Sequence, residues 1–176
     1  MSRVLLLPLA LGLAGISGAQ ERPDLSGEWT YSEDRASTVA TTGDASFRKG
    51  DMGSGWGPTI RITHRADSLI VTYVFFSNYD LQPPLRFAYA MDGTETRHTV
   101  MIGHATAEQR SKVSWQGTTL VITTVHRAPT TDGRAGLVEV RQALTLDSPT
   151  SLTIETTRVG ALGGARTTTK TVYTKR

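Results

Sequence analysis

The chain has 176 residues, with 19 lysines and arginines against 16 aspartates and glutamates and a formal net charge of +3 at pH 7. The basic residues are scattered along the sequence, which excludes the basic stripe or patch that nucleic-acid-binding proteins carry. The chain contains no cysteine. Disulfides and cysteine-ligated metal sites are therefore excluded, and stability must come from a hydrophobic core.

The first segment predicts an export signal. Arg3 supplies a positive charge, residues 4–16 form an apolar run, and Ser17, Gly18 and Ala19 are small residues of the kind that a signal peptidase reads. A membrane anchor is disfavoured, because the run has about 13 residues and spanning a bilayer takes about 20. We expect cleavage after Ala19, export to the periplasm or the medium, and no transmembrane segment in the remaining chain.

The remaining chain, residues 20–176, is expected to form one domain made of strands. Polar and apolar residues alternate in short segments, and helical periodicity is missing after the signal. Turn signals such as Asp92-Gly93 and Gln116-Gly117 separate the segments. The predicted strands are residues 27–32, 59–64, 68–76, 85–91, 94–102, 107–115, 119–126, 137–146, 151–158 and 167–175. The fold class is thus all-β, a single antiparallel up-and-down barrel of about 8–10 strands.

Two segments interrupt this rhythm. Residues 34–58 are rich in Gly, Ser and Thr and predict a long flexible loop, in which Trp56 either packs over the barrel mouth or forms a local contact. Residues 159–165 predict a Gly-rich hairpin loop and no phosphate-binding loop, since no helix follows.

A set of short motifs in order gives the chain a family resemblance. The set comprises Gly27-Glu28-Trp29 and residues 115–120, 144–147, 151–154 and 172–176. It resembles the lipocalin-like secreted bacterial proteins of the calycin superfamily, although the disulfide, the central Thr-Asp-Tyr motif and the C-terminal helix of true lipocalins are missing. The resemblance implies a barrel with a cavity for a small apolar or amphipathic molecule. It also implies that Gly27 and Trp29 close one barrel end beneath a cation, either Lys175 or Arg176.

Alternation suggests which residues point into the barrel, although a slip of one residue would reverse the faces. We expect an inward set of Ile60, Ile62, Tyr73, Phe75, Phe87, Tyr89, Met101, Leu120 and Ile122. Pro83 and Pro84 stiffen the connection after Tyr79. This segment has two interpretations: an aromatic-rich portal to the barrel, or a proline-fixed turn with aromatic residues on the surface. The candidate ligand-binding residues are Trp56, Tyr73, Phe75, Phe76, Tyr79, Phe87 and Tyr89.

The sequence contains no recognisable catalytic or metal motif. His64, His98, His104 and His126 match no metal-binding spacing, and a Gly-x-Ser-x-Gly elbow is missing. We therefore expect no catalytic residues, no metal and no cofactor. Three hypotheses remain: a carrier of a small ligand, a filled barrel that serves as an interaction module of the cell envelope, and an isomerase-like enzyme. The enzyme would need a buried polar group such as Tyr73, Arg86 or His98.

Overall fold

A computed structural model describes residues 21–32, 55–73, 84–102, 105–129, 134–159 and 166–176. They form ten strands: β1 (Gly27–Tyr31), β2 (Thr59–His64), β3 (Ser68–Tyr73), β4 (Leu85–Ala90), β5 (Thr96–Ile102), β6 (Ala105–Gln116), β7 (Thr119–Pro129), β8 (Ala135–Ser148), β9 (Ser151–Val159) and β10 (Thr167–Lys175). Strands that are consecutive in the chain pair antiparallel, with the exception of β4 and β5, and β1 pairs with β10. The described part of the chain holds no helix long and apolar enough to cross a membrane.

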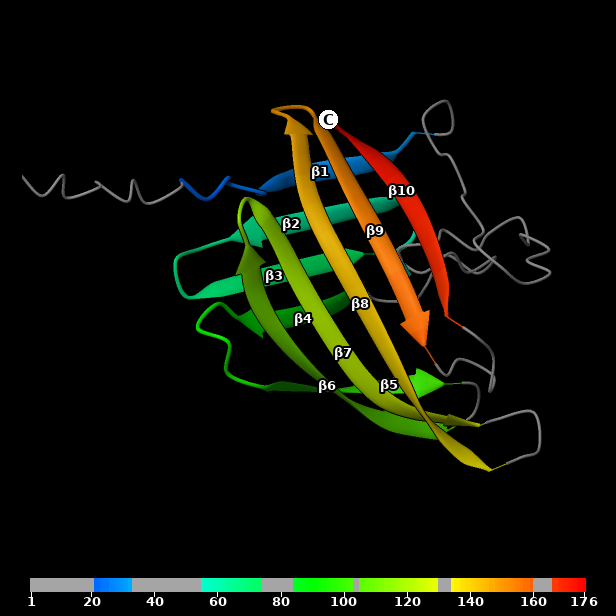
Figure 1. Ribbon diagram of the computed structural model, residues 1–176. Coiled ribbons are helices and arrows are strands. Elements are labelled where there is room, and N and C mark those ends of the chain that lie inside the picture. The colour runs from blue at the N-terminus through cyan, green and yellow to red at the C-terminus, as the bar shows by residue number, and fades with distance from the viewer. Residues whose placement is uncertain (1–20, 33–54, 74–83, 103–104, 130–133, 160–165) are drawn as a thin grey trace, which may run out of the picture.

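These pairings make one nearly closed up-and-down barrel. The sheet runs in the order β4-β3-β2-β1-β10-β9-β8-β7-β6-β5, so only β4 and β5 lack a backbone ladder between them. In Figure 1, β1–β4 lie behind the long strands β7–β10 and cross them at a steep angle. The predicted fold class is confirmed. All ten predicted strands are present, two of them, β2 and β10, with the predicted bounds.

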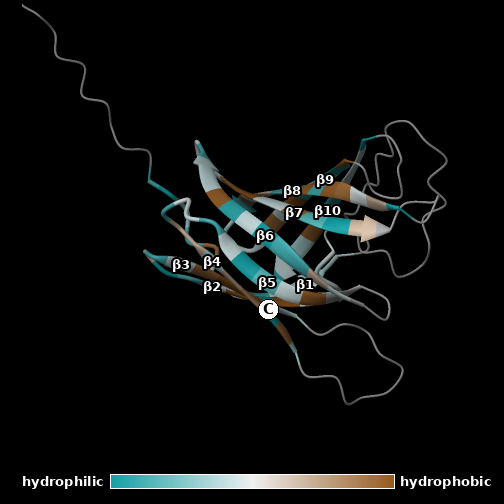
Figure 2. Ribbon diagram, turned by 90° about the horizontal axis from the view of Figure 1, so that it is seen from below, coloured by the Kyte–Doolittle hydropathy of each residue, from teal (hydrophilic) through white to brown (hydrophobic). Residues whose placement is uncertain are grey.

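The core follows the alternation of the strands. Figure 2 shows hydrophobic and hydrophilic bands alternating along the strands. Seven residues of the expected inward set are buried in one cluster: Ile60, Ile62, Tyr73, Phe87, Tyr89, Leu120 and Ile122. Phe75 lies outside the described residues. On β5, Val100 packs against the core, one position before the expected Met101, whose side chain lies outside the described part.

One barrel end is closed by Trp29 and the segment that precedes β1. Trp29 and Leu25 are fully buried, and the Trp29 indole N–H donates a hydrogen bond of 3.1 Å to the Leu25 carbonyl. The Lys175 ammonium lies 5.3 Å from the centre of the Trp29 ring. A Cβ on Gly27 would come within 2.5 Å of Lys175 Cε. The Gly-x-Trp motif is thereby explained, because only a residue without a side chain lets the lysine cross above the indole.

Of the two cations that the sequence offered for this place, the structure uses Lys175. Arg176 lies beside it and pairs with the Glu28 carboxylate at 3.6 Å. The expectation that Arg176 belongs to the barrel-end motif is corrected accordingly. The reason is the pleat: residues 174 and 176 point away from the barrel end that Lys175 covers, because successive side chains leave a strand on opposite faces.

The seam between β4 and β5 is bridged by a side chain. The Ala88 backbone N–H of β4 donates a 3.1 Å hydrogen bond to Nε2 of His98 on β5. The imidazole also makes edge contacts with Phe87 and Tyr89, with ring centres 5.1 and 5.5 Å away. His98 thus supplies one hydrogen bond between β4 and β5, which form no backbone ladder with each other. This role requires the neutral ring, since a protonated Nε2 has no lone pair to accept the N–H.

Candidate functional site

A pocket of about 150 Å³ lies inside the barrel, between β3 and β4 on one side and β6–β9 on the other. Consecutive antiparallel strands are joined at the same end of a barrel. One end of this barrel therefore holds the strand termini Tyr31, Thr59, Tyr73, Leu85 and Val159. The pocket lies toward that end, opposite Trp29. Several connections between strands lie outside the described residues, namely residues 33–54, 74–83, 103–104, 130–133 and 160–165. The predicted loop conformations of residues 34–58 and 159–165 are therefore not tested.

Trp56 is brought into the pocket by the short segment before β2. Gly55 and Gly57 flank it with φ values of +80° and +77°, which glycine adopts without strain. The Tyr173 hydroxyl donates a 2.8 Å hydrogen bond to the Gly57 carbonyl, and the Tyr31 amide donates one of 2.8 Å to that of Pro58. Trp56 is consequently buried, with 4% of its surface exposed. The interpretation in which Trp56 packs down over the barrel agrees with this position.

One wall of the pocket is aromatic. It consists of Trp56 with Tyr73 from β3 and Phe87 and Tyr89 from β4. The rings of Tyr73 and Phe87 are nearly parallel, with centres 5.8 Å apart and planes 8° apart. Those of Phe87 and Tyr89 are 6.5 Å and 16° apart. This wall presents a row of aligned, buried rings, a surface that favours a flat apolar group.

The facing wall is polar. It is formed by inward residues of four adjacent strands, Gln109 of β6, Thr124 and His126 of β7, Val140 and Gln142 of β8, and Arg158 of β9. The Thr124 hydroxyl is anchored by a 2.8 Å hydrogen bond to Ser111. Gln142 is buried, with 5% of its surface exposed. Buried amides and hydroxyls are costly unless they find partners, so their presence opposite an aromatic wall indicates a pocket with two chemical halves.

Burial sets the charge states in the pocket. It raises the pKa of Tyr73 to about 12 and raises that of Tyr89 as well, so both phenols stay protonated at neutral pH. Burial also lowers the pKa of His126, which favours the neutral ring. The Nδ1 atom of His126 is buried without a hydrogen-bond partner among the described residues. Of the described lining residues, Arg158 is then the one with a full charge at pH 7.

The structure places four of the seven predicted ligand-binding residues together in this pocket: Trp56, Tyr73, Phe87 and Tyr89. Phe75, Phe76 and Tyr79, and with them the predicted portal, lie outside the described residues. The polar wall was not predicted. Its residues lie on strands with polar side chains on both faces, such as Gln109 and Glu108 or Gln142 and Arg141, so alternation gave no sign of which face is internal.

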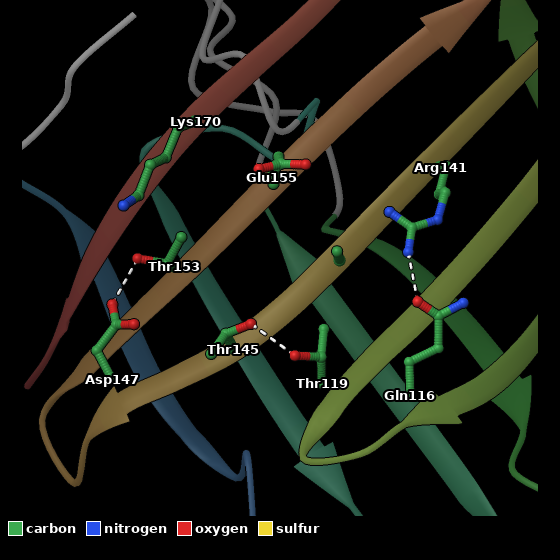
Figure 3. Close-up of a pocket in the computed structure, with 9 residues that line it drawn as sticks. Gln116, Thr119, Arg141, Thr145, Asp147, Thr153, Glu155 and Lys170 are labelled. Carbon is green, nitrogen blue, oxygen red and sulfur yellow. Dashed lines mark hydrogen bonds between the residues drawn. The ribbon is translucent and has the colours of Figure 1, made fainter. Parts of the chain in front are cut away.

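A second hollow, of about 420 Å³, lies on the outer face of the barrel (Figure 3). It runs over β6–β10 and is lined by Gln116, Thr119, Arg141, Ala143, Thr145, Asp147, Thr153, Glu155 and Lys170. Its side chains bind one another: Arg141 donates to the side-chain amide oxygen of Gln116 at 2.8 Å, and the Thr153 hydroxyl donates to the Asp147 carboxylate at 2.5 Å. Charges of both signs line this hollow, with Arg141 and Lys170 on the one hand and Asp147 and Glu155 on the other.

The remaining titratable residues form no catalytic arrangement in the described part of the chain. That part holds no group of three or more His, Asp or Glu side chains placed to bind a metal. Arg86 is exposed, so it is not a polar group deep in the cavity. Glu95 and Glu108 contact Arg97 at 3.5 and 3.9 Å on the outer face, as surface ion pairs do.

Comparisons of the chain with protein-family models, with curated proteins and with solved structures find no match. Function is therefore inferred from the pocket, the outer hollow and the sequence.

Proposed function

We propose that this chain is an exported, lipocalin-like protein that binds a small amphipathic molecule in the pocket inside its barrel. The observation that carries the proposal is the pairing of a buried aromatic wall with a polar wall around about 150 Å³ of space. A barrel filled only for stability favours apolar side chains from all strands. Ligand sites instead combine aromatic surface with a few convergent polar groups.

The size of the pocket limits the ligand. An apolar cavity of about 150 Å³ accommodates a molecule about as large as benzene. Long lipids are therefore disfavoured within the described volume, and a compact molecule of roughly ten heavy atoms is favoured. Export and a lipocalin-like relationship are supported by the leader pattern of residues 1–19 and by the Gly27–Trp29–Lys175 arrangement at the closed end.

The test is to purify the chain from an export host, record its native mass, denature it and identify any molecule released. Val140→Phe should lower the amount of bound molecule severalfold, because Val140 lines the pocket. Val125→Phe is the matched control, since the neighbours of Val125 on β7, Thr124 and His126, face the pocket and Val125 faces outward. An equal loss in both variants, or no bound molecule and no thermal shift across a metabolite panel, would count against ligand binding.

The alternative function is a filled barrel that acts as an interaction module of the cell envelope. The outer hollow over β6–β10 favours it, because its volume of about 420 Å³ exceeds that of the internal pocket. Arg141→Glu should then abolish capture of a partner from an envelope extract, while Val140→Phe should leave the capture unchanged. Val140→Phe and Arg141→Glu together thus distinguish the two functions.

A further inference from the structure

We infer that the internal pocket selects small phenols, neutral molecules with one flat ring and one hydroxyl group. This inference rests on the proposed function and adds a ligand class to it. It follows from three features of the pocket: polar side chains without a hydrogen-bond partner, the neutral state of these side chains, and the row of aromatic rings beside them.

Two polar side chains of the lining have no hydrogen bond to the described residues. Tyr89 is buried, and its pKa is raised by burial and by the nearby Tyr73, with no contribution from a hydrogen bond. Burial likewise lowers the pKa of His126 without a hydrogen bond, and the Nδ1 atom of this ring is buried and unpartnered. Buried polar groups are costly unless they are paired. Both side chains therefore favour a ligand that can form a hydrogen bond.

These two side chains belong to one side of the pocket. The Tyr89 ring centre lies 5.5 Å from that of His98. His98 stands opposite Gln109 in the ladder of β5 and β6, and Gln109 stands opposite His126 in the ladder of β6 and β7. Side chains directly opposite each other on antiparallel strands have Cβ atoms about 4.5–5.5 Å apart. The Tyr89 phenol, the Gln109 amide and the His126 imidazole therefore line neighbouring parts of the pocket.

The neutral state of these groups selects a neutral ligand. Burial raises the pKa of Tyr89 and lowers that of His126, so both side chains are uncharged at pH 7. Arg158 and Gln142 also line the pocket, but each already has an interaction partner in the protein. Moving an ion from water to the side of an aromatic wall costs far more than moving a hydroxyl group. The ligand is therefore not expected to carry a charge.

A hydroxyl group matches the unpartnered side chains best. A hydroxyl both donates and accepts hydrogen bonds, and a neutral imidazole has one donor and one acceptor. The hydroxyl of a ligand can thus pair with the Tyr89 hydroxyl in either direction, and with His126 whichever ring nitrogen carries the proton. An ether oxygen can only accept.

The aromatic wall selects a flat ring as the rest of the ligand. Tyr73, Phe87 and Tyr89 form a nearly parallel series, with interplanar angles of 8° and 16°. A flat molecule packs against such a series with offset-stacked or edge contacts, which contribute beyond simple burial of area. The pocket volume of about 150 Å³ admits one ring with a short substituent. Phenol itself is the simplest molecule of this description.

The first experiment uses 4-nitrophenol, whose hydroxyl ionises near neutral pH and whose neutral and anionic forms differ in colour. Visible absorbance gives the apparent pKa of this probe with and without a saturating amount of the unaltered chain. Preferential binding of the neutral form raises the apparent pKa, and a tenfold preference raises it by about one unit. We expect a rise of at least about one unit. A pocket that prefers anions would lower the apparent pKa instead.

The second experiment compares phenol with toluene, which has a methyl group in place of the hydroxyl, by isothermal titration calorimetry at pH 7. Phenol should bind at least about threefold more tightly, the lower range for a neutral hydrogen bond. Tyr89→Phe should remove most of this preference by weakening the binding of phenol and not that of toluene. Tyr31→Phe is the matched control, because it makes the same change at a tyrosine of β1 outside the described lining of the pocket. Circular dichroism shows whether both variants are folded.

The outcomes distinguish the ligand class from the proposed function. If 4-nitrophenol binds with an unchanged or lowered apparent pKa, the selection of neutral ligands is overturned while pocket binding stands. Equal affinity for phenol and toluene, or equal losses in Tyr89→Phe and Tyr31→Phe, would overturn the role of the hydroxyl group. Failure of all three probes to bind would overturn the ligand class. If native mass spectrometry also shows no bound molecule, the proposed function fails with it.

Discussion

Replacing Gly27 by alanine tests the closed end of the barrel. The new Cβ would lie 2.5 Å from Lys175 Cε and 3.3 Å from the Trp29 indole nitrogen. The first distance is too short for any real contact, and the lysine can move, so the ammonium must leave its position 5.3 Å from the centre of the indole ring. The substitution also places a side chain on a backbone whose φ is +155°, a value that glycine tolerates and alanine does not.

The expected cost has two parts. The backbone strain contributes about 1–3 kcal/mol. Loss of the cation–π contact contributes about 0.5–1 kcal/mol, the range for an exposed cation. Gly27→Ala should therefore lower the free energy of unfolding by about 1.5–4 kcal/mol. In a Lys175→Ala background only the first part remains, so the cost of Gly27→Ala should fall by about 0.5–1 kcal/mol.

The assay is urea unfolding of the four proteins of this double-mutant cycle, followed by far-ultraviolet circular dichroism. Equal slopes against urea are required, because a changed slope would mean that the unfolded or native state has changed in compactness. A coupling of zero within error would refute the reasoning. It would mean that the lysine does not stabilise the barrel through Trp29 and that the motif needs glycine for its backbone alone.

The other predictions concern the seam and the core. Burial lowers the pKa of His98; the unfolded chain then binds more protons, so stability is complete above about pH 6.5 and is lost as pH falls below that value. His98→Gln keeps a hydrogen-bond acceptor and should reduce the fall in urea midpoint between pH 8 and pH 5. If the midpoint of the variant falls as much as that of the unaltered chain, His98 is not the source of the pH dependence. Ser111→Ala should cost about 1–3 kcal/mol by stranding the buried Thr124 hydroxyl, and adding Thr124→Val should recover part of it in a double-mutant cycle. Leu144→Ala should cost about 2–5 kcal/mol in urea unfolding, because Leu144 is fully buried. Leu137→Ala, with 66% of the residue exposed, should stay within about 0.5 kcal/mol, and similar costs for the two leucines would contradict the assigned faces.

The strands were predictable because local signals of two kinds agree. Period-two alternation marks segments such as residues 59–64, and glycines such as Gly93 and Gly117, with φ values of +83° and +61°, terminate them in turns. Part of the meander followed from these signals, since strands joined by short turns, such as β2 with β3 and β6 with β7, pair with each other. Alternation also divided each strand into two faces, and seven residues of the expected inward set are buried in the core.

The polar wall and the seam were not predictable from those signals. Hydropathy separates Leu120 from Thr119, but it does not separate inward Gln142 from outward Arg141, because both residues read as solvent-facing. The seam depends on how far the sheet curls before its edges meet. That curl is the sum of small twists over ten strands. The position of the seam therefore cannot be predicted from the residues around His98.

The pairing of β1 with β10 has a consequence for how the barrel assembles. Every other ladder joins strands that are neighbours in the chain, whereas this one brings Trp29 beside Lys175. The entropy lost in closing such a long loop must be met before its contacts form, so non-local pairing comes late. Hairpins can zip together one after another and remain an open, curling ribbon until the first strand meets the last. The indole, the glycine and the lysine at that junction would then act as a latch that holds the finished barrel shut, slowing its unfolding more than hastening its formation.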